Sequence, residues 1–322
     1  MKGPDRTSTC FFGSIPQSTM HSFKTTLVIF GLILAPLVAA AQEPDTSGGI
    51  PMGAAMQPDT PVAEWSDKTI LVIGAHPDDE SQAYGTLSRL VENGNEVHVL
   101  IMTTGNVGTK DPDMTRNRLS QIRRQEMLEA LSVIGVPEEN YINLGYTDGM
   151  LEFANEKDVV RRLVRHIRKI QPDVLFAFDP GYGYQVWHKT DHRAASYLAA
   201  DAARAAEWRL LFPGQINHDG LEAHAIDEYM LFGGTGESQS VRVDISGDPA
   251  EKKVEALTKH QSQFSSAWSD YRAELPADER KAFRERMRTR VFENTHDGVP
   301  VESFHYYRGI PDGIGNRHGE GY

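Results

Sequence analysis

The stretch LVIGAHPDDE, residues 71–80, decides how the fold of this chain is read. An apolar, β-branched run of this kind is typical of a central strand in a parallel sheet, and here it leads directly into a histidine and three carboxylates. The carboxyl ends of such strands open onto the crevice where α/β proteins bind ligands. Consecutive like charges are costly there without a cation. The stretch therefore favours a divalent metal, held by His76 and one of the aspartates, over a solvated acidic loop, and this ligand chemistry suits zinc.

Strand-like and helix-like segments alternate from Thr69 onward, which predicts right-handed βαβ units. The expected fold class is α/β, a Rossmann-like three-layer α/β/α arrangement with a mostly parallel sheet. A charged region over 252–290 carries an apolar helical stripe and is expected to be a docked surface helix. The predicted strands are 69–74, 96–102, 141–144, 173–178 and 228–232, and the predicted helices are 81–93, 117–134, 157–170, 191–207 and 249–264.

The beginning of the chain has the layout of a secretory signal peptide. Residues 22–41 read SFKTTLVIFGLILAPLVAAA: a lysine, an apolar run and three small residues before Gln42. The apolar run is too short for a membrane span, although an uncleaved anchor is the alternative. We expect residues 1–41 to be removed, with Met20 as a candidate true start. The protein is then exported, periplasmic or secreted, and keeps no stable membrane anchor.

The rest of the composition limits the kinds of cross-link, domain organisation and partner that can be expected. The only cysteine, Cys10, lies in this leader, so neither a disulfide nor a thiolate ligand is expected in the mature chain. Residues 42–65, rich in proline and glycine, read as a flexible lead-in to one large domain over 66–322. A formal net charge of −12 argues against nucleic acid or anionic membrane surfaces as partners. The oligomeric state is not predicted.

A third ligand for the metal can come from the segment after the fourth predicted strand. His188 and His192 are four residues apart at or near a helix start, so they can share one helix face. An isolated pair of this kind is more often two ordinary surface histidines. Its place after a strand end of the same sheet favours the functional interpretation.

These motifs together resemble the LmbE-like or PIG-L family of zinc-dependent N-deacetylases. The resemblance rests first on His-Pro-Asp-Asp-Glu at 76–80 and on the later His-Lys-Thr-Asp-His at 188–192. It spans Thr69 to Tyr307 and continues, in the family's order, through residues 122–126, 130–131, 134–136, 144–149, 259–263 and 302–304.

The resemblance implies one zinc ion per chain, with His76, Asp79 and His192 as its ligands and water in the fourth place. It makes Asp78 the general base, which agrees with the chemistry, because a carboxylate that does not bind the metal can take a proton from water and return it to the leaving amine. His188 would stabilise the oxyanion or protonate the nitrogen.

The second motif departs from the family, which usually spaces these two histidines one residue closer. The departure leaves the role of His188 open, and Asp191 could hydrogen-bond to a histidine ligand from outside the metal's own ligand set.

Substrate contacts are also implied by the resemblance. The residues expected to bind the sugar are Arg123, Arg124, Asp148 and His260. A salt bridge within the helix layer explains the arginines and the aspartate equally well, and a lone helical histidine is more often structural.

The sequence thus predicts a zinc-dependent hydrolase that removes an N-acyl group, expected to be N-acetyl, from a small-molecule or glycoconjugate amino sugar. One alternative is a non-catalytic carbohydrate-binding protein on the same scaffold, which the intact Asp78 disfavours. The other is a metal-dependent phosphoester hydrolase, a chemistry that often uses two metals, whereas the residues provide ligands for one.

We expect the mature exported protein to begin at Gln42, because Ala39-Ala40-Ala41 forms the cleavage signal after the apolar run. Intact-mass spectrometry of the exported protein measures this directly. Retention of residues before Ala39 would contradict the prediction.

Overall fold

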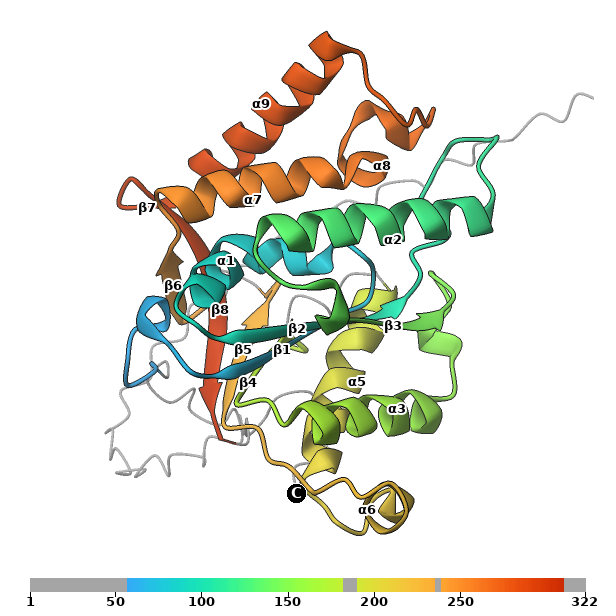
Figure 1. Ribbon diagram of the computed structural model, residues 1–322, viewed down its shortest axis with the longest axis vertical. Coiled ribbons are helices and arrows are strands. Elements are labelled where there is room, and N and C mark those ends of the chain that lie inside the picture. The colour runs from blue at the N-terminus through green and yellow to red at the C-terminus, as the bar shows by residue number, and fades with distance from the viewer. Residues whose placement is uncertain (1–56, 182–189, 235–238, 310–322) are drawn as a thin grey trace, which may run out of the picture. The chain divides into compact units, whose positions relative to one another are not determined.

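The fold is built on a single sheet. The computed structural model describes residues 57–181, 190–234 and 239–309. The strands lie in the order β3-β2-β1-β4-β5-β8-β6, with β7 paired to β8 (Figure 1). Neighbouring strands from β3 to β5 run parallel, whereas β8 runs antiparallel to both β5 and β6. The strands are β1 (Thr69–Gly74), β2 (Glu96–Thr103), β3 (Tyr141–Tyr146), β4 (Val174–Phe178), β5 (Glu228–Phe232), β6 (Val241–Asp244), β7 (Thr295–His296) and β8 (Val299–Arg308).

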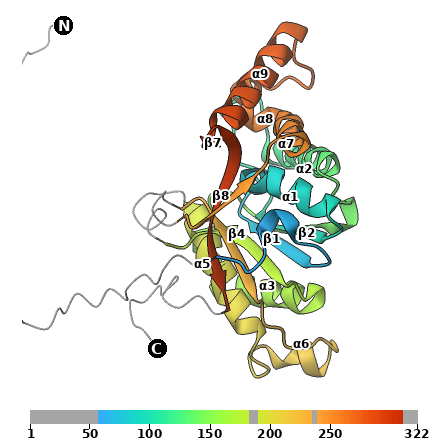
Figure 2. The same ribbon diagram turned by 90° about the vertical axis from the view of Figure 1, so that its left-hand side faces the viewer.

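Helices cover both faces of this sheet (Figure 1). One layer holds α1, α2, α7, α8 and α9, and the other holds α3 and α5, while α6 and α9 lie at opposite ends of the fold (Figure 2). This arrangement confirms the predicted three-layer α/β/α fold with a mostly parallel sheet. The helices are α1 (Tyr84–Glu92), α2 (Arg116–Val133), α3 (Glu156–Ile170), α5 (Thr190–Ala206), α6 (Pro213–Asn217), α7 (Asp248–Lys259), α8 (Gln261–Phe264) and α9 (Ala277–Glu293).

Local sequence explains where these elements begin and how they pack. The central strand β1 is buried on both faces, which is why its sequence is continuously apolar instead of alternating. Thr115 and Asn155 are the N-caps of α2 and α3, and each side chain accepts a hydrogen bond from a backbone N–H of the first turn. The predicted apolar stripe of α9 is confirmed, since its three side chains are buried: Phe283, Met287 and Val291.

Two predicted boundaries change. The helix expected over 249–264 is interrupted at His260, which separates α7 from α8. The lead-in expected over 42–65 was given an end that lies too far along the sequence. Val62 and Trp65 already belong to the buried core, and the Asn95 side chain donates to the Trp65 carbonyl. Its residues 42–56, and the whole leader, lie outside the described residues. None of the described helices is long and apolar enough to cross a membrane.

The topology gathers polar segments at one edge of the sheet. Because β1, β2, β3 and β4 are parallel, their carboxyl ends lie at the same edge. The segments that follow them begin at Ala75, Thr104, Thr147 and Asp179. The first described residue of α5, Thr190, comes after β4 in the sequence. This edge is where the sequence predicted the site.

Arg168 on α3 donates hydrogen bonds to the end of α5 and to the chain that follows it. Its side chain is 1% exposed and donates to the backbone carbonyls of Ala205, Ala206, Trp208, Leu211 and Phe212. A helix end leaves its last carbonyls without intrahelical donors, and this guanidinium supplies them.

Replacing Arg168 by Met should therefore lower the free energy of unfolding by about 3 kcal/mol or more, because buried carbonyls lose their donor. Arg165→Met is the matched control on the same helix. Its pair with Asp219 is about half exposed, so the loss should stay below about 1 kcal/mol. Urea unfolding of both variants measures the difference, and equal losses would contradict the assignment.

Candidate metal centre

The turn after β1 is built around the carboxylate of Asp79. Its Oδ2 accepts hydrogen bonds from the backbone N–H groups of Ala75 (2.8 Å) and His76 (2.7 Å). These bonds fold the side chain back over the turn and fix its orientation. Gly74 makes room for it, since a Cβ there would lie 3.1 Å from the Asp79 Cβ and 2.8 Å from Ile101 Cδ1.

The turn brings the first two predicted ligands beside the third, His192, near the start of α5. His192 Nε2 lies 3.0 Å from Asp79 Oδ1 and 3.1 Å from His76 Nδ1, and His76 Nδ1 lies 3.7 Å from Asp79 Oδ2. A tetrahedral ion with ligands at 2.0–2.2 Å separates its donor atoms by about 3.4 Å. The predicted trio thus has the spacing of three ligands around one small divalent ion.

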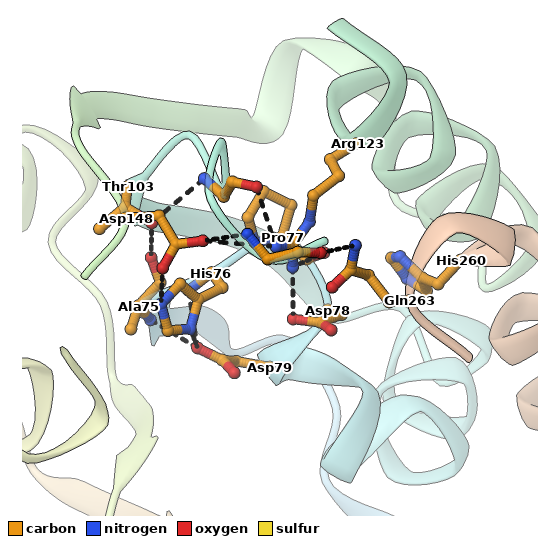
Figure 3. A network of polar contacts seen from close by, with 12 residues as sticks. Ala75, His76, Pro77, Asp78, Asp79, Thr103, Arg123, Asp148, His260 and Gln263 are labelled. Carbon is orange, nitrogen blue, oxygen red and sulfur yellow. Dashed lines mark hydrogen bonds and ion pairs between the residues drawn. The ribbon is translucent and has the colours of Figure 1, made fainter. Parts of the chain in front are cut away.

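The opposite side of the His76 ring explains why Nδ1 is available to a metal. His76 Nε2 lies 3.0 Å from Asp148 Oδ1 (Figure 3). The same nitrogen lies 3.3 Å from Asp191 Oδ2. Carboxylate oxygens are acceptors, so Nε2 carries a hydrogen, and Nδ1 is the nitrogen that can bind a metal in place of a proton. Asp191 is itself held by the N–H groups of Gly149 and Leu151. The contact expected of Asp191 with a histidine ligand is therefore present.

The electrostatics of this cluster favour a cation. Burial lowers the pKa of His76, but hydrogen bonds to the carboxylates of Asp148, Asp191 and Asp79 outweigh it and hold that pKa well above its ordinary value. The side chain of Phe178 stacks on His192, with ring centroids 4.4 Å apart, and limits how the ring can turn. The residues present therefore fit a metal ion in both charge and donor set.

A second set of three metal-binding groups shares the same imidazole: His76, Asp148 and Asp191. Its nitrogen is Nε2, which already donates to the two carboxylates. A metal at Nδ1 and a hydrogen at Nε2 occupy both ring nitrogens. A second metal at Nε2 would require the loss of that hydrogen. The geometry is in keeping with one ion per chain.

Asp78 lies beside the trio without belonging to it. Its side chain is 17% exposed, and Oδ1 accepts a hydrogen bond from Arg123 Nη2 at 3.0 Å (Figure 3). Burial raises the pKa of Asp78 above its usual value, although the charge of Arg123 opposes that rise. A partly exposed carboxylate next to the ligand cluster is placed to exchange a proton with a small molecule bound there.

Arg123 is buried (2% exposed) and holds three parts of the site together. Besides Asp78, it donates to the carbonyls of Pro77 and Gly105, and its Nη1 lies 3.8 Å from Asp148 Oδ2. Gly105 permits this approach, because a Cβ there would lie 2.6 Å from the guanidinium, and its φ of +63° also favours glycine.

The structure separates the residues predicted to bind substrate. Arg123 faces the site, but Arg124 points away from it, is largely exposed and pairs with Glu138 at 3.3 Å. The prediction for Arg124 is therefore wrong: consecutive helix residues point about 100° apart, and only one can face the crevice. Asp148 lies at the site and is 12% exposed on its side chain, so its role toward substrate stays a prediction.

His260 is also misplaced by the sequence-based prediction. Its side chain has no exposed surface, so it cannot contact a substrate; Nε2 lies 2.6 Å from the Tyr84 hydroxyl, which donates to Glu80. Burial lowers the pKa of His260 to about 3 and raises the pKa of Glu80 to about 8. The third acid of the motif thus belongs to a buried network behind the site. The four-residue spacing of Glu80 and Tyr84 was the only sequence signal for it.

His188, the other residue predicted to act on the substrate, lies outside the described residues.

Comparison with known proteins identifies the family of the chain. The family model described as GlcNAc-PI de-N-acetylase (PIG-L) matches residues 71–203, which contain the whole trio. The diacetylchitobiose deacetylase of Thermococcus kodakarensis is 30% identical over 201 residues, covering 61% of this chain and 70% of that protein. The chain belongs to the PIG-L family. The family predicted from the motifs is thereby confirmed.

Two further comparisons extend the PIG-L likeness over most of each relative. A probable N-acetyl-α-D-glucosaminyl L-malate deacetylase of Bacillus anthracis is 24% identical, covering 65% of this chain and 87% of that protein. The solved structure of an N,N′-diacetylchitobiose deacetylase from Pyrococcus horikoshii, bound to an inhibitor, has a TM-score of 0.62 and 28% identity. It covers 76% of this chain and 85% of that one.

Metal content should depend on His192. We expect His192→Ala to lose most of the bound metal, because a nitrogen donor 3.0–3.1 Å from both other ligands is removed. His188→Ala should keep much of it. Elemental analysis of the purified variants after metal loading and dialysis measures both. A depleted His188 variant beside a loaded His192 variant would reverse the ligand assignment.

Proposed function

We propose that this protein is a zinc-dependent hydrolase that removes the N-acetyl group from an amino-sugar conjugate. The observation that carries the proposal is the trio of His76, Asp79 and His192 with a non-ligating carboxylate, Asp78, beside it. Relatives of this PIG-L protein that are named as deacetylases of N-acetylated amino sugars support the substrate class. The identity of the metal as zinc is supported by the mixed imidazole and carboxylate donor set.

The chemistry needs both halves of this arrangement. A bound zinc ion would polarise the acetamide carbonyl and lower the pKa of a water molecule toward about 7. Asp78 accepts the proton that this water loses as its oxygen attacks the carbonyl carbon. The same carboxyl then delivers the proton to the nitrogen as the C–N bond breaks, so that acetate and a free amine leave.

The remaining side chains of the site keep these groups in position. Arg123 fixes the Asp78 carboxylate through Nη2, so its second oxygen can face the water. Asp148 and Asp191 hold the His76 ring so that Nδ1 faces the metal position. Because a displacement of about 1 Å can cost a hundredfold in rate, this support is part of the catalytic arrangement.

Export to the periplasm or the medium is part of the proposal, on the strength of the leader sequence alone. It would give the enzyme access to amino-sugar conjugates outside the cytoplasm.

The metal-loaded protein should release free amine and acetate from N-acetylglucosamine conjugates and lose this activity in a chelator. Asp78→Asn should lower kcat by about 10²–10⁴, because asparagine keeps the shape of the side chain but cannot accept the proton. Metal content should stay near that of the unmodified protein. Amine release and elemental analysis on the same samples measure both.

The matched control is Asp278→Asn, an exposed aspartate on α9 that should change neither quantity. Loss of metal in Asp78→Asn would make Asp78 a ligand, and full activity would remove it from the mechanism. Binding of the sugar without amine release by the metal-loaded protein would favour a non-catalytic carbohydrate-binding protein. Release of phosphate from phosphoesters with two metals per chain would favour the phosphoester hydrolase.

A further inference from the structure

Three large hydrophobic side chains are exposed on one turn that follows α5. They are Trp208 (53% exposed), Leu210 (89%) and Leu211 (46%). A hydrogen bond from the Leu211 N–H to the Trp208 carbonyl, at 3.0 Å, closes the turn. Because the three side chains come from four consecutive residues, they lie next to one another. We call residues 208–211 the apolar turn, and exposed apolar surface gathered in this way is a common mark of a binding surface.

The apolar turn is held from inside the protein. The buried guanidinium of Arg168 donates to the carbonyls of Trp208 (2.9 Å) and Leu211 (3.0 Å). The next side chain, Phe212, is half-buried against the core. The shape of the turn therefore does not depend on its exposed side chains. An apolar surface that is fixed in advance loses little conformational entropy when it binds a partner.

The apolar turn lies far from the candidate metal centre. Helix α5 leads from one to the other, since His192 is its third residue and Ala206 is its last. These two residues are fourteen positions apart, which corresponds to about 21 Å along a helix. The turn is followed directly by α6, which lies at one end of the fold (Figure 1). It is therefore no part of the site that would bind the substrate.

The surface beside the apolar turn is basic, although the whole chain has a formal net charge of −12. Helix α3 contains six lysines and arginines against two acidic residues. Two contacts join it to α6 and to the chain that follows: the Gln215 side chain donates to the Arg161 carbonyl at 2.8 Å, and Arg165 pairs with Asp219. Arg209 lies exposed within the turn itself.

The charge close to the turn matters more than the overall charge. Burial lowers the pKa of His166 on α3, and the charges of Lys169, Arg162 and Arg165 lower it further, which reflects a positive potential along this helix. Interactions between exposed charges are screened over about 8 Å at physiological salt. Acidic residues elsewhere on the molecule therefore contribute little here. The overall charge, which argues against anionic membranes, does not describe this surface.

We propose that the apolar turn docks the protein reversibly on an anionic phospholipid membrane. Its indole and leucine side chains enter the boundary between head groups and acyl chains, where an amphipathic indole is favoured. Arg209 and the basic residues of α3 that adjoin α6 lie at the level of the phosphates, since a guanidinium binds phosphate through two parallel hydrogen bonds. The proposal goes beyond the proposed activity and does not rest on it.

Protein partners fit this surface less well. A second copy of the chain, bound through the same turn about a two-fold axis, would bring Arg209 and its basic neighbours against themselves. Each partner in a stable protein interface buries roughly 800 Å², which is more than three side chains on one turn expose. A lipid surface needs no matching shape, so a small apolar turn with basic neighbours is sufficient.

The test is sedimentation of the protein with vesicles of equal parts phosphatidylcholine and phosphatidylglycerol. All samples lack residues 1–41, because their apolar run would bind lipid by itself, and the described fold begins at residue 57. Leu210→Ser should weaken vesicle binding about tenfold, because one leucine side chain no longer leaves the water. Phe153→Ser is the matched control. It removes an apolar side chain that is 74% exposed outside the turn, and it should leave binding unchanged.

The basic residues are tested separately. Arg209→Gln should weaken binding to these vesicles about fivefold, because the attraction of one arginine to the anionic lipids is lost. It should have little effect on vesicles of phosphatidylcholine alone. Arg286→Gln, on α9 at the opposite end of the fold (Figure 2), is the matched control and should change neither. An equal loss on both kinds of vesicle would overturn the proposal of an anionic surface.

Insertion is measured with lipids that carry bromine in their acyl chains, because bromine quenches the fluorescence of a tryptophan that reaches it. Quenching should be clear in the unmodified protein and largely lost in Trp208→Phe. Equal quenching in both proteins would overturn the proposal. Equal vesicle binding by the unmodified protein and Leu210→Ser, or no binding by either, would overturn it as well.

Two further measurements detect the other occupants of the turn. Urea unfolding should be the same in Leu210→Ser and the unmodified protein, because the replaced side chain is exposed. A marked loss of stability without a change in vesicle binding would place the turn against another segment of this chain. A dimer that forms without lipid and dissociates in Leu210→Ser would assign the turn to a second copy. Either result would overturn membrane docking.

Discussion

The rest of the site depends on the orientation of one imidazole. His76 Nε2 points at the carboxylates of Asp148 and Asp191, so Nδ1 is left facing Asp79 and His192. These contacts join the turn after β1, the loop after β3 and the start of α5 around a single ring. The tertiary structure therefore decides which nitrogen of His76 can bind a metal.

The site is surrounded by charges that would be unfavourable without mutual compensation. Four carboxylates, from Asp78, Asp79, Asp148 and Asp191, surround two histidines and one buried arginine. Arg123 balances Asp78, whereas the remaining carboxylates converge on the imidazoles. A divalent cation between His76 Nδ1, Asp79 and His192 would complete this balance. The donor set is therefore better explained by a metal centre than by a structural ion-pair network.

The loop after β2 links the metal centre to the segment that contains Gln263 and Trp268. Val107 and Gly108 hold Asp148 with their N–H groups, while the Gly108 carbonyl holds Trp268 and also accepts from Gln263. The same short loop thus orients both Asp148, which contacts His76, and the indole of Trp268.

The sequence by itself determined the fold class, because continuous apolar strands directly reflect burial. Its His-Pro-Asp-Asp-Glu turn indicated a metal site, and the resemblance to the family supplied the full set of candidate ligands. It could not separate Arg123 from Arg124, nor place His260, because the direction in which a helix residue points depends on the packing of that helix. Only the tertiary structure decided that Arg123 holds Asp78, that His260 is buried behind Tyr84, and that Trp268 reaches Gly108 across 160 residues of sequence. Such contacts follow from the way the helices and loops pack around the sheet, which no local pattern records.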